Sequence, residues 1–275
     1  MVAPALVLVT ETAGSEKNVE YFRQLLTRMR QMRPQLNVQL AFADDPTQAI
    51  DDLRLREPSK SSEDDSDDEF PAQLAPAEIV LVPLEISSVQ EPRPGAQSLA
   101  TAIRAAYADS KVHLARPIGP ASELLGIVDL RLRAALSALR VTELDALVLL
   151  APGGADTRGA TLLSRRARQW AARLKLPVNL AIADSPSTSL SSAIANLHDQ
   201  GRRRIAVGCL HLTADDEFQA QLEIAKACDA LAVSAPLGVD DRILEIAMGR
   251  YAFAAMAMLD DAHPVPDSSD EDDAE

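Results

Sequence analysis

Aromatic residues, cysteine and long apolar runs are all scarce in this chain of 275 residues. Aromatic residues make up 3% of it although hydrophobic residues make up 47%, so Ala, Leu, Val and Ile must build the core. The two cysteines, Cys209 and Cys228, form no CxxC pair, which indicates a reducing compartment and no disulfide framework. No apolar run approaches the ~20 residues that span a bilayer, and residues 1–10 lack the pattern of a signal peptide. The sequence therefore predicts a cytoplasmic protein with no membrane partner.

Basic residues are also in deficit, because 27 Lys and Arg stand against 41 Asp and Glu and the net charge is −14. This balance argues against nucleic acid or an anionic membrane surface as a partner. Much of the excess lies in two runs, residues 61–69 and 267–275. Runs of this kind are usually solvated and without fixed structure. We therefore expect a disordered insert at about residues 58–70 and a disordered acidic tail at 263–275, with a metal-capturing tail as the alternative.

The chain contains a long internal repeat. The segment LAFADDP at residues 40–46 matches LAIADSP at 180–186, and the same offset of 140 relates Gly14 to Gly154. Each copy reads as a buried strand, a tight turn, a helix and a second strand. The sequence therefore predicts one α/β unit written twice.

The repeat extends into two halves, residues 1–140 and 141–262. We expect strands at 6–9, 38–43, 79–84, 112–115, 147–151, 178–183, 205–209 and 230–233. We expect helices at 19–32, from 46 onward, at 97–108, at 121–139, between the strands at 147–151 and 178–183, and at 241–259. Apolar strands that alternate with helices predict an α/β fold of two similar Rossmann-like halves, each a four-stranded, mainly parallel sheet flanked by helices. The helix at 121–139 is expected to close the first half.

Ligands of such sheets bind beyond the carboxyl ends of the strands, so the informative turns are 11–15, 85–95, 151–158 and 209–217. The first reads Thr-Ala-Gly-Ser at 12–15, and the third strand runs through Val-Pro-Leu at 82–84 toward Ser-Ser at 87–88. The segments HLARPIGP at 113–120 and GGADTRG at 153–159 follow later. Together these segments resemble the sirohydrochlorin chelatase family, which inserts Co²⁺ or Fe²⁺ into a tetrapyrrole.

The resemblance implies a chelatase-like fold and a role in cobalamin or siroheme biosynthesis. It implies a divalent metal ion, Co²⁺ or Fe²⁺, as a substrate, a tetrapyrrole as the small-molecule partner and no organic cofactor. The substrate-binding residues that it implies lie in the turns: Gly14, Ser15, Ser87, Ser88, Gly153, Gly154 and Arg158.

The sequence departs from the family pattern at the histidines. The motif histidine is Ala13 here, and the second histidine position falls near Glu91. Alanine can neither ligate a metal nor accept a pyrrole proton, and in the family those histidines serve both needs.

His211 is the histidine that we place at a strand-end turn, and it forms a Cys-x-His pair with Cys209. An offset of 126 relates it to Glu85, and relates Glu217 to Glu91. We therefore take His211, Glu85 and Glu91 as candidate catalytic residues, and His211 and Glu91 as candidate metal ligands. The alternative is a buried cysteine with a loop histidine beside ordinary solvated acidic loops.

Two hypotheses follow. In the first, the protein is a tetrapyrrole chelatase that binds its substrate between the halves, with Arg93, Arg116 and Arg158 available for bidentate carboxylate contacts. In the second, it is a non-catalytic paralogue that binds tetrapyrrole or metal, or that scaffolds a partner. The missing histidine favours the second hypothesis, and the overall pattern favours the first. The sequence leaves the oligomeric state open.

Overall fold

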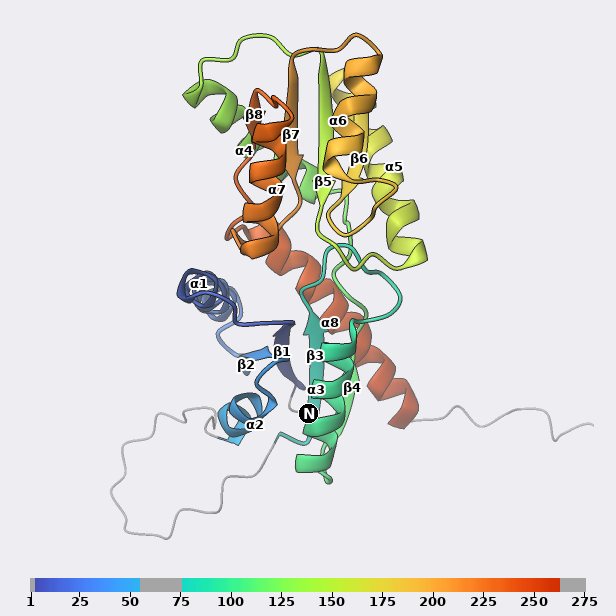
Figure 1. Cartoon of the computed structure of the whole chain (residues 1–275). Coiled ribbons are helices and arrows are strands. Elements are labelled where there is room, and N and C mark those ends of the chain that lie inside the picture. The colour runs from blue at the N-terminus through green and yellow to red at the C-terminus, as the bar shows by residue number, and fades with distance from the viewer. Residues whose placement is uncertain (1–2, 55–75, 263–275) are drawn as a thin grey trace, which may run out of the picture.

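A computed structural model of the chain describes residues 3–54 and 76–262. The expected insert and tail lie outside these ranges. The chain forms two halves stacked end to end (Figure 1). The first contains β1 (Ala5–Thr10), α1 (Glu16–Met32), β2 (Val38–Phe42), α2 (Pro46–Arg54), β3 (Glu78–Pro83), α3 (Pro94–Ala106), β4 (Lys111–Leu114) and α4 (Leu124–Ala138). The second contains β5 (Ala146–Ala151), α5 (Thr157–Leu174), β6 (Val178–Ile182), α6 (Leu190–Asp199), β7 (Ile205–Cys209), α7 (Asp216–Ala227), β8 (Ala232–Val233) and α8 (Asp241–Ala262).

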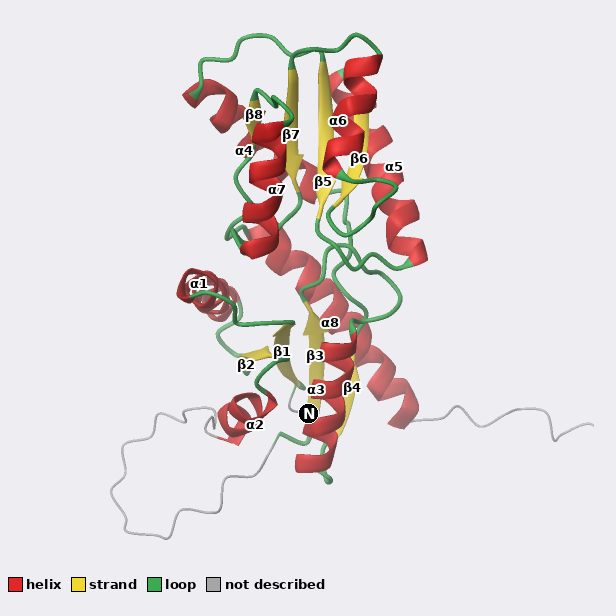
Figure 2. Cartoon of the chain, in the orientation of Figure 1, coloured by secondary structure: helices red, strands yellow, loops and turns green. Residues whose placement is uncertain are grey.

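Each half is built on a four-stranded parallel sheet, in the orders β2-β1-β3-β4 and β6-β5-β7-β8. The strands lie side by side between helices (Figure 2). The central strands are buried on both faces, which explains why β1 and β5 are continuous apolar runs rather than alternating ones. The predicted α/β fold of two similar halves is confirmed. Helices α6 and α7 complete the alternation of strands and helices in the second half.

The last helix of each half packs on the sheet of the other half. Helix α4 lies against β7 and β8, and α8 lies against β3 and β4 (Figure 1). Trp170 of α5 donates its indole N–H to Asp129 of α4 at 2.7 Å, and Tyr251 of α8 donates its hydroxyl to Pro4 O at 2.7 Å. The helix predicted at 121–139 is present as α4 at the end of the first half, but the sheet that it covers belongs to the other half. Its apolar side meets the second sheet, where Val128 and Trp170 crowd Gly208.

This exchange joins the two halves through one apolar core. That core contains Leu6 and Leu8 of β1, Leu147 and Leu149 of β5, and the buried faces of α1, α4, α5 and α8. The opposite faces of the sheets carry separate cores, one under α2 and α3 and one under α6 and α7. The sequence boundary at residue 140 therefore separates two repeats of the chain and not two independent cores.

The repeat offset changes by one residue inside each half. It is 141 from Ala5 to Ala146 through the starts of α1 and α5, and it is 140 over β2 and β6, from Val38 and Val178 to Phe42 and Ile182. The reason is that α5 has 18 residues against 17 in α1, while the connection that follows α5 is two residues shorter.

Gly14 and Gly154 consequently share a turn but differ by one position within it. Both have positive φ angles, 59° and 72°, which favour glycine. The backbone N–H of Gly154 donates to Asp184 at 2.7 Å, and in the first half the equivalent donor is Ala13, 3.3 Å from Asp44 Oδ2. Ala13 is therefore the positional counterpart of Gly154. Across both described ranges, no helix has the length and apolarity needed to cross a membrane.

Candidate functional site

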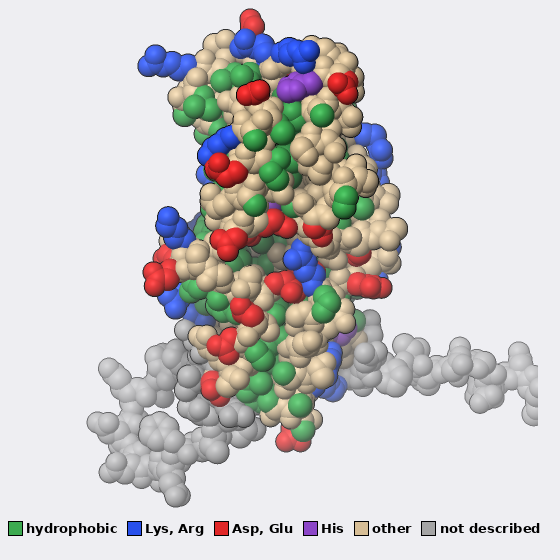
Figure 3. Space-filling view, in the orientation of Figure 1, with side chains coloured by type: hydrophobic (Ala, Val, Ile, Leu, Met, Phe, Trp, Pro, Cys, Tyr) green, Lys and Arg blue, Asp and Glu red, His purple; other side chains and the backbone are tan. Residues whose placement is uncertain are grey.

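A pocket of about 550 Å³ lies where the carboxyl ends of the two sheets face each other. Its walls come from the loop after β3, the turn after β5, the end of β6 and the first turn of α7. Acidic side chains gather around the hollow between the halves, with a basic side chain among them (Figure 3). The lining residues are Ser88, Glu91, Pro92, Arg93, Pro94, Gln97, Gly153, Gly154, Ala155, Asp156, Asp184 and Glu217. We call this pocket the inter-half cleft.

Asp156 ties the two walls of the cleft together. One carboxylate oxygen accepts from Gly159 N and caps α5. The other accepts from Val89 N and Gln90 N, both at 2.9 Å, and from Glu91 N at 3.4 Å. Partial burial opposes ionisation of this carboxyl, but the four N–H donors outweigh it and lower its pKa to about 2. Asp156 is therefore a structural anion that holds the loop after β3 against α5.

The two serines of the loop after β3 also fix the position of that loop. Ser87 donates its hydroxyl to Pro152 O at 2.5 Å, and Ser88 donates to Glu91 O at 2.6 Å. Both side chains are buried, although Ser88 also lines the cleft. A Cβ atom at Gly159 would overlap the carbonyl of Ser87, so glycine is required where α5 meets this loop.

Glu85 lies behind one wall of the cleft, where it contacts the backbone of the lining residue Arg93. Glu85 is 8% exposed, and its carboxylate accepts from the backbone N–H of Arg93 at 2.9 Å. Burial raises the pKa of Glu85 to about 7, against the opposing effects of the Arg93 N–H and guanidinium. The Arg93 guanidinium reaches across the cleft to donate to Gly153 O. Arg93 thus links the halves and places a positive charge between carboxylates.

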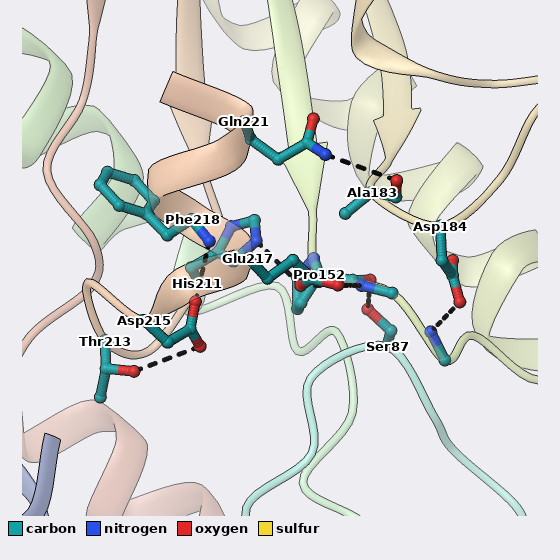
Figure 4. A network of polar contacts seen from close by, with 12 residues as sticks. Ser87, Pro152, Ala183, Asp184, His211, Thr213, Asp215, Glu217, Phe218 and Gln221 are labelled. Atoms are coloured by element: carbon teal, nitrogen blue, oxygen red, sulfur yellow. Dashed lines mark hydrogen bonds and ion pairs between the residues drawn. The ribbon is translucent and has the colours of Figure 1, made fainter. Parts of the chain in front are cut away.

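His211 lies behind the opposite wall and is only 1% exposed. Its Nε2 atom is 3.2 Å from Glu217 Oε2, and the Phe218 ring packs edge-on against the imidazole at 5.7 Å between centroids. Glu217 also accepts from Gly153 N at 3.2 Å. Burial of the Glu217 carboxyl works against these hydrogen bonds, and the net result is a lowered pKa. Figure 4 shows the chain of contacts from His211 through Glu217 to the turn after β5.

The carboxylate beside His211 is Glu217, whereas the candidate metal ligand Glu91 lies in the loop after β3. The segment between the strand and the helix is four residues longer after β3 than after β7, because α3 begins at Pro94 and α7 at Asp216. The offset of 126 fails across this difference, so Glu217 corresponds to Gly95 and the predicted equivalence with Glu91 is wrong. Cys209 is not part of a thiolate site, because its complete burial raises its pKa to about 12.

The cleft gathers part of the predicted set. Ser88, Glu91, Gly153 and Gly154 line it together with Arg93. Glu85 and His211 lie one layer behind, in contact with the lining residues Arg93 and Glu217. Three predicted substrate contacts, Gly14, Ser15 and Arg158, are exposed and outside the lining. Ser87 is buried in the loop contact described above.

Sequence reasoning missed Asp184 and Gln97 as lining residues. Asp184 lies two residues after the apolar strand β6 and accepts a hydrogen bond from Gly154 N, in the turn after the neighbouring strand β5. The internal repeat indicates this role, because Asp44 lies at the matching position of the first half and accepts a hydrogen bond from Ala13 N. Asp44 and Asp184 follow the second strand of their halves at matching positions. An acidic residue that recurs in this way after a strand is a candidate to brace a turn or to face a ligand.

The cleft is electrostatically suited to cations. Its lining contains Glu91, Asp156, Asp184 and Glu217 against the single guanidinium of Arg93, and an acidic recess raises the local concentration of cations. Within residues 3–54 and 76–262, however, no group of three or more His, Cys, Asp or Glu side chains is arranged to hold a metal ion. The protein alone therefore does not offer a complete coordination sphere in this part of the chain.

Several solved structures have the same fold as this chain. No protein-family model and no curated protein matches the sequence. Two solved structures of similar size do match: SirB from Bacillus subtilis with Fe³⁺ has a TM-score of 0.63 and 15% identity over 94% of this chain and 97% of that one. The sirohydrochlorin chelatase SirB from Bacillus subtilis subspecies spizizenii, in complex with cobalt, has a TM-score of 0.62 and 14% identity over 92% and 96%.

A third structure, DR2241 from Deinococcus radiodurans, is a multi-domain protein with structural similarity to chelatases. It has a TM-score of 0.58 and 12% identity over 92% of this chain and 55% of that one. Identities this low show a shared fold and no more, so the chain has the chelatase-like two-half fold.

Proposed function

We propose that this protein is a chelatase-like protein that binds a sirohydrochlorin-type tetrapyrrole in the inter-half cleft and handles Co²⁺ or Fe²⁺ there as a substrate ion. The observation that carries the proposal is the carboxylate-lined cleft where both sheets of a chelatase-like fold end. Ligands of open parallel sheets bind at this position. The fold places the cleft, and the carboxylates supply the attraction for a divalent ion.

Metal insertion needs a ligand for the incoming ion and a base for two pyrrole protons. The four nitrogens of the macrocycle complete the coordination sphere, so fewer than three protein ligands suffice while the ion is transferred. Glu91 and the ionised Glu217 carboxylate are the proposed points of capture, with His211 as the nitrogen ligand and proton acceptor behind Glu217.

Glu85 is the second proposed proton acceptor. A carboxyl whose pKa is about 7 exchanges protons readily at neutral pH. Its backbone contact with Arg93 sets it directly behind a residue that lines the cleft. Arg93 is also the proposed partner for a substrate carboxylate, because its fork already points between the two walls.

The remaining predicted residues receive lesser roles. Gly153, Gly154 and Ser88 line the cleft as further proposed substrate contacts, and the two glycines make room for the Arg93, Asp184 and Glu217 side chains. Gly14, Ser15 and Arg158 contact only those substituents that extend past the pocket, and Ser87 positions the loop.

A non-catalytic role is the second candidate, and one observation favours it. Ala13 stands where the family's motif histidine would be, and His211 is buried and already bound to Glu217. In that case the cleft binds tetrapyrrole or metal without catalysing metallation.

The test is to incubate the pure protein with sirohydrochlorin and Co²⁺ or Fe²⁺ and to follow the absorbance change against a control without protein. We expect metallation above the control and a loss of about a hundredfold in His211→Ala, the range for a positioned acid–base group. His198→Ala, which changes a histidine on α6, is the matched control and should leave the rate unchanged. Ala13→His should raise metal affinity or turnover.

The outcomes separate the two candidates. Tetrapyrrole binding without metallation, unchanged by Ala13→His, supports the non-catalytic role. Efficient metallation that His211→Ala does not slow would refute the assignment of His211. A protein that binds neither the macrocycle nor the metal rejects both candidates.

A further inference from the structure

A second recess lies at the opposite end of the first sheet from the cleft. It has a volume of about 500 Å³ and runs beside the amino-terminal end of β4. Arg104, Lys111, His113 and Met258 are among its lining residues, and none of the described residues that line it carries a carboxylate. We call this recess the β4 groove.

The β4 groove is a sheet edge as well as a basic surface. Strand β4 is the last in the order β2-β1-β3-β4, so its outer side has no strand neighbour among the described residues. Arg104 donates its Nε–H to the carbonyl of Val112 at 3.3 Å, which sets a guanidinium along that edge. Free strand edges are usually covered or charged to prevent pairing with other chains. A cationic edge on a chain of net charge −14 attracts an acidic segment.

The chain itself carries such a segment within reach. Met258 lines the groove and belongs to α8, which ends at Ala262, about 6 Å further along the helix axis. Residues 267–275 contain six carboxylate side chains, at Asp267, Asp270, Glu271, Asp272, Asp273 and Glu275. An extended chain covers about 17 Å in the five residues from Ala262 to Asp267. The tether therefore holds these carboxylates at a high effective concentration near the groove.

We propose that the acidic segment at residues 267–275 binds in the β4 groove of its own chain, where Arg104, Lys111 and His113 contact its carboxylates. The segment then covers the free edge of the first sheet. The other acidic run, at 61–69, rejoins the described chain near the same end, where Lys111 N donates to Ala77 O at 2.9 Å. The connection from Glu69 to Ala77 spans eight residues, whereas the connection from Ala262 to Asp267 spans five. The shorter connection favours residues 267–275 as the occupant.

Carbodiimide cross-linking of the full-length protein tests the proposal, because the chain has only five lysines, Lys17, Lys60, Lys111, Lys175 and Lys226. We expect mass spectrometry to show Lys111 joined to the 267–275 segment within one molecule. Lys17 and Lys175, both exposed elsewhere, are the matched controls and should not join it. The cross-link should weaken several-fold in 1 M salt, where the screening length is about 3 Å, and in the double variant Arg104→Gln and His113→Gln.

A second measurement uses the full chain with the six carboxylates replaced by their amides. Acylation of Lys111 should then become several-fold faster than in the unchanged protein, while that of Lys175 stays the same. Three results would overturn the proposal: cross-links from Lys111 to residues 61–69 instead, cross-links only between molecules, or equal cross-linking of Lys17 and Lys175 to the acidic segment.

Discussion

Burial of the Glu85 side chain raises the pKa of its carboxyl, and this makes the stability of the protein depend on pH. The pKa of Glu85 is raised to about 7, above the value of about 4.3 for an unperturbed glutamate. The folded state therefore binds a proton that the unfolded state has released between these two values. Stability is retained below the unfolded pKa and falls as the pH rises through the folded pKa.

Glu85→Gln should consequently stabilise the protein at high pH. The amide keeps an acceptor for the Arg93 N–H and removes the buried charge. The difference in unfolding free energy between variant and wild type should grow from pH 4.5 to pH 7, reaching at most about 4 kcal/mol above pH 8. Urea unfolding at pH 5, 6, 7 and 8 measures it. A difference that does not change with pH would show that Glu85 is not buried as described.

Asp156 titrates in the opposite sense. Four backbone N–H donors lower its pKa to about 2 despite partial burial, so its contribution is present above the unfolded value and is lost as the pH falls through the folded pKa. Asp156→Asn should cost about 1–3 kcal/mol at pH 7, because the amide keeps one acceptor oxygen but loses the charge and turns an N–H donor toward N–H groups that the carboxylate had accepted. Asp215→Asn is the matched control and should cost less in the same urea measurement, because the amide oxygen can still accept from Phe218 N and cap α7. Equal losses would mean that Asp156 does not brace the loop after β3.

At the scale of single elements, the exchange of α4 and α8 makes β7 a tight contact surface. A Cβ atom at Gly208 would overlap the Trp170 ring and lie 2.6 Å from Val128 Cγ1. Both neighbours are buried and cannot move freely. The strand is therefore adapted to the helix that the other half supplies.

Gly208→Ala should destabilise the protein by about 1–3 kcal/mol, the usual cost of overpacking a core. Gly249→Ala on α8 is the matched control, because its Cβ would meet nothing within 4 Å. Alanine in a helix interior is favoured over glycine by about 1 kcal/mol, so this variant should be slightly more stable. Thermal unfolding of both variants tests the packing of α4. A Gly208→Ala protein as stable as Gly249→Ala would contradict it.

For the whole molecule, the shared core predicts that the halves depend on each other. A fragment of residues 1–140 would carry α4 without the sheet that buries it and would lack α8 over β3 and β4. We expect neither this fragment nor one of residues 141–262 to fold alone, and the intact chain to unfold in one calorimetric transition. Circular dichroism of the separate and mixed fragments measures this. Two independent transitions, or a stably folded single fragment, would show that the halves are separate domains.

The positions of the strands and the internal repeat follow from local patterns in the chain. Apolar runs bounded by Gly, Pro and Asp located the strands to within two residues, and the matching segments at 40–46 and 180–186 showed that the fold is written twice. These features are local, because burial on both faces of a parallel sheet leaves a continuous apolar run in the chain. The fold class followed from them.

Tertiary structure alone decided which helix covers which sheet and which side chains meet in the cleft. Helix α4 has an apolar face that fits either sheet by composition, and only packing against Trp170 and Gly208 selects the second one. Glu217 corresponds to Gly95 and not to Glu91 because loop length, rather than strand periodicity, sets where a helix begins. Asp156 became a brace because two segments far apart in sequence supply its donors. Such contacts depend on distances between elements, and a chain's own periodicity carries no record of those distances.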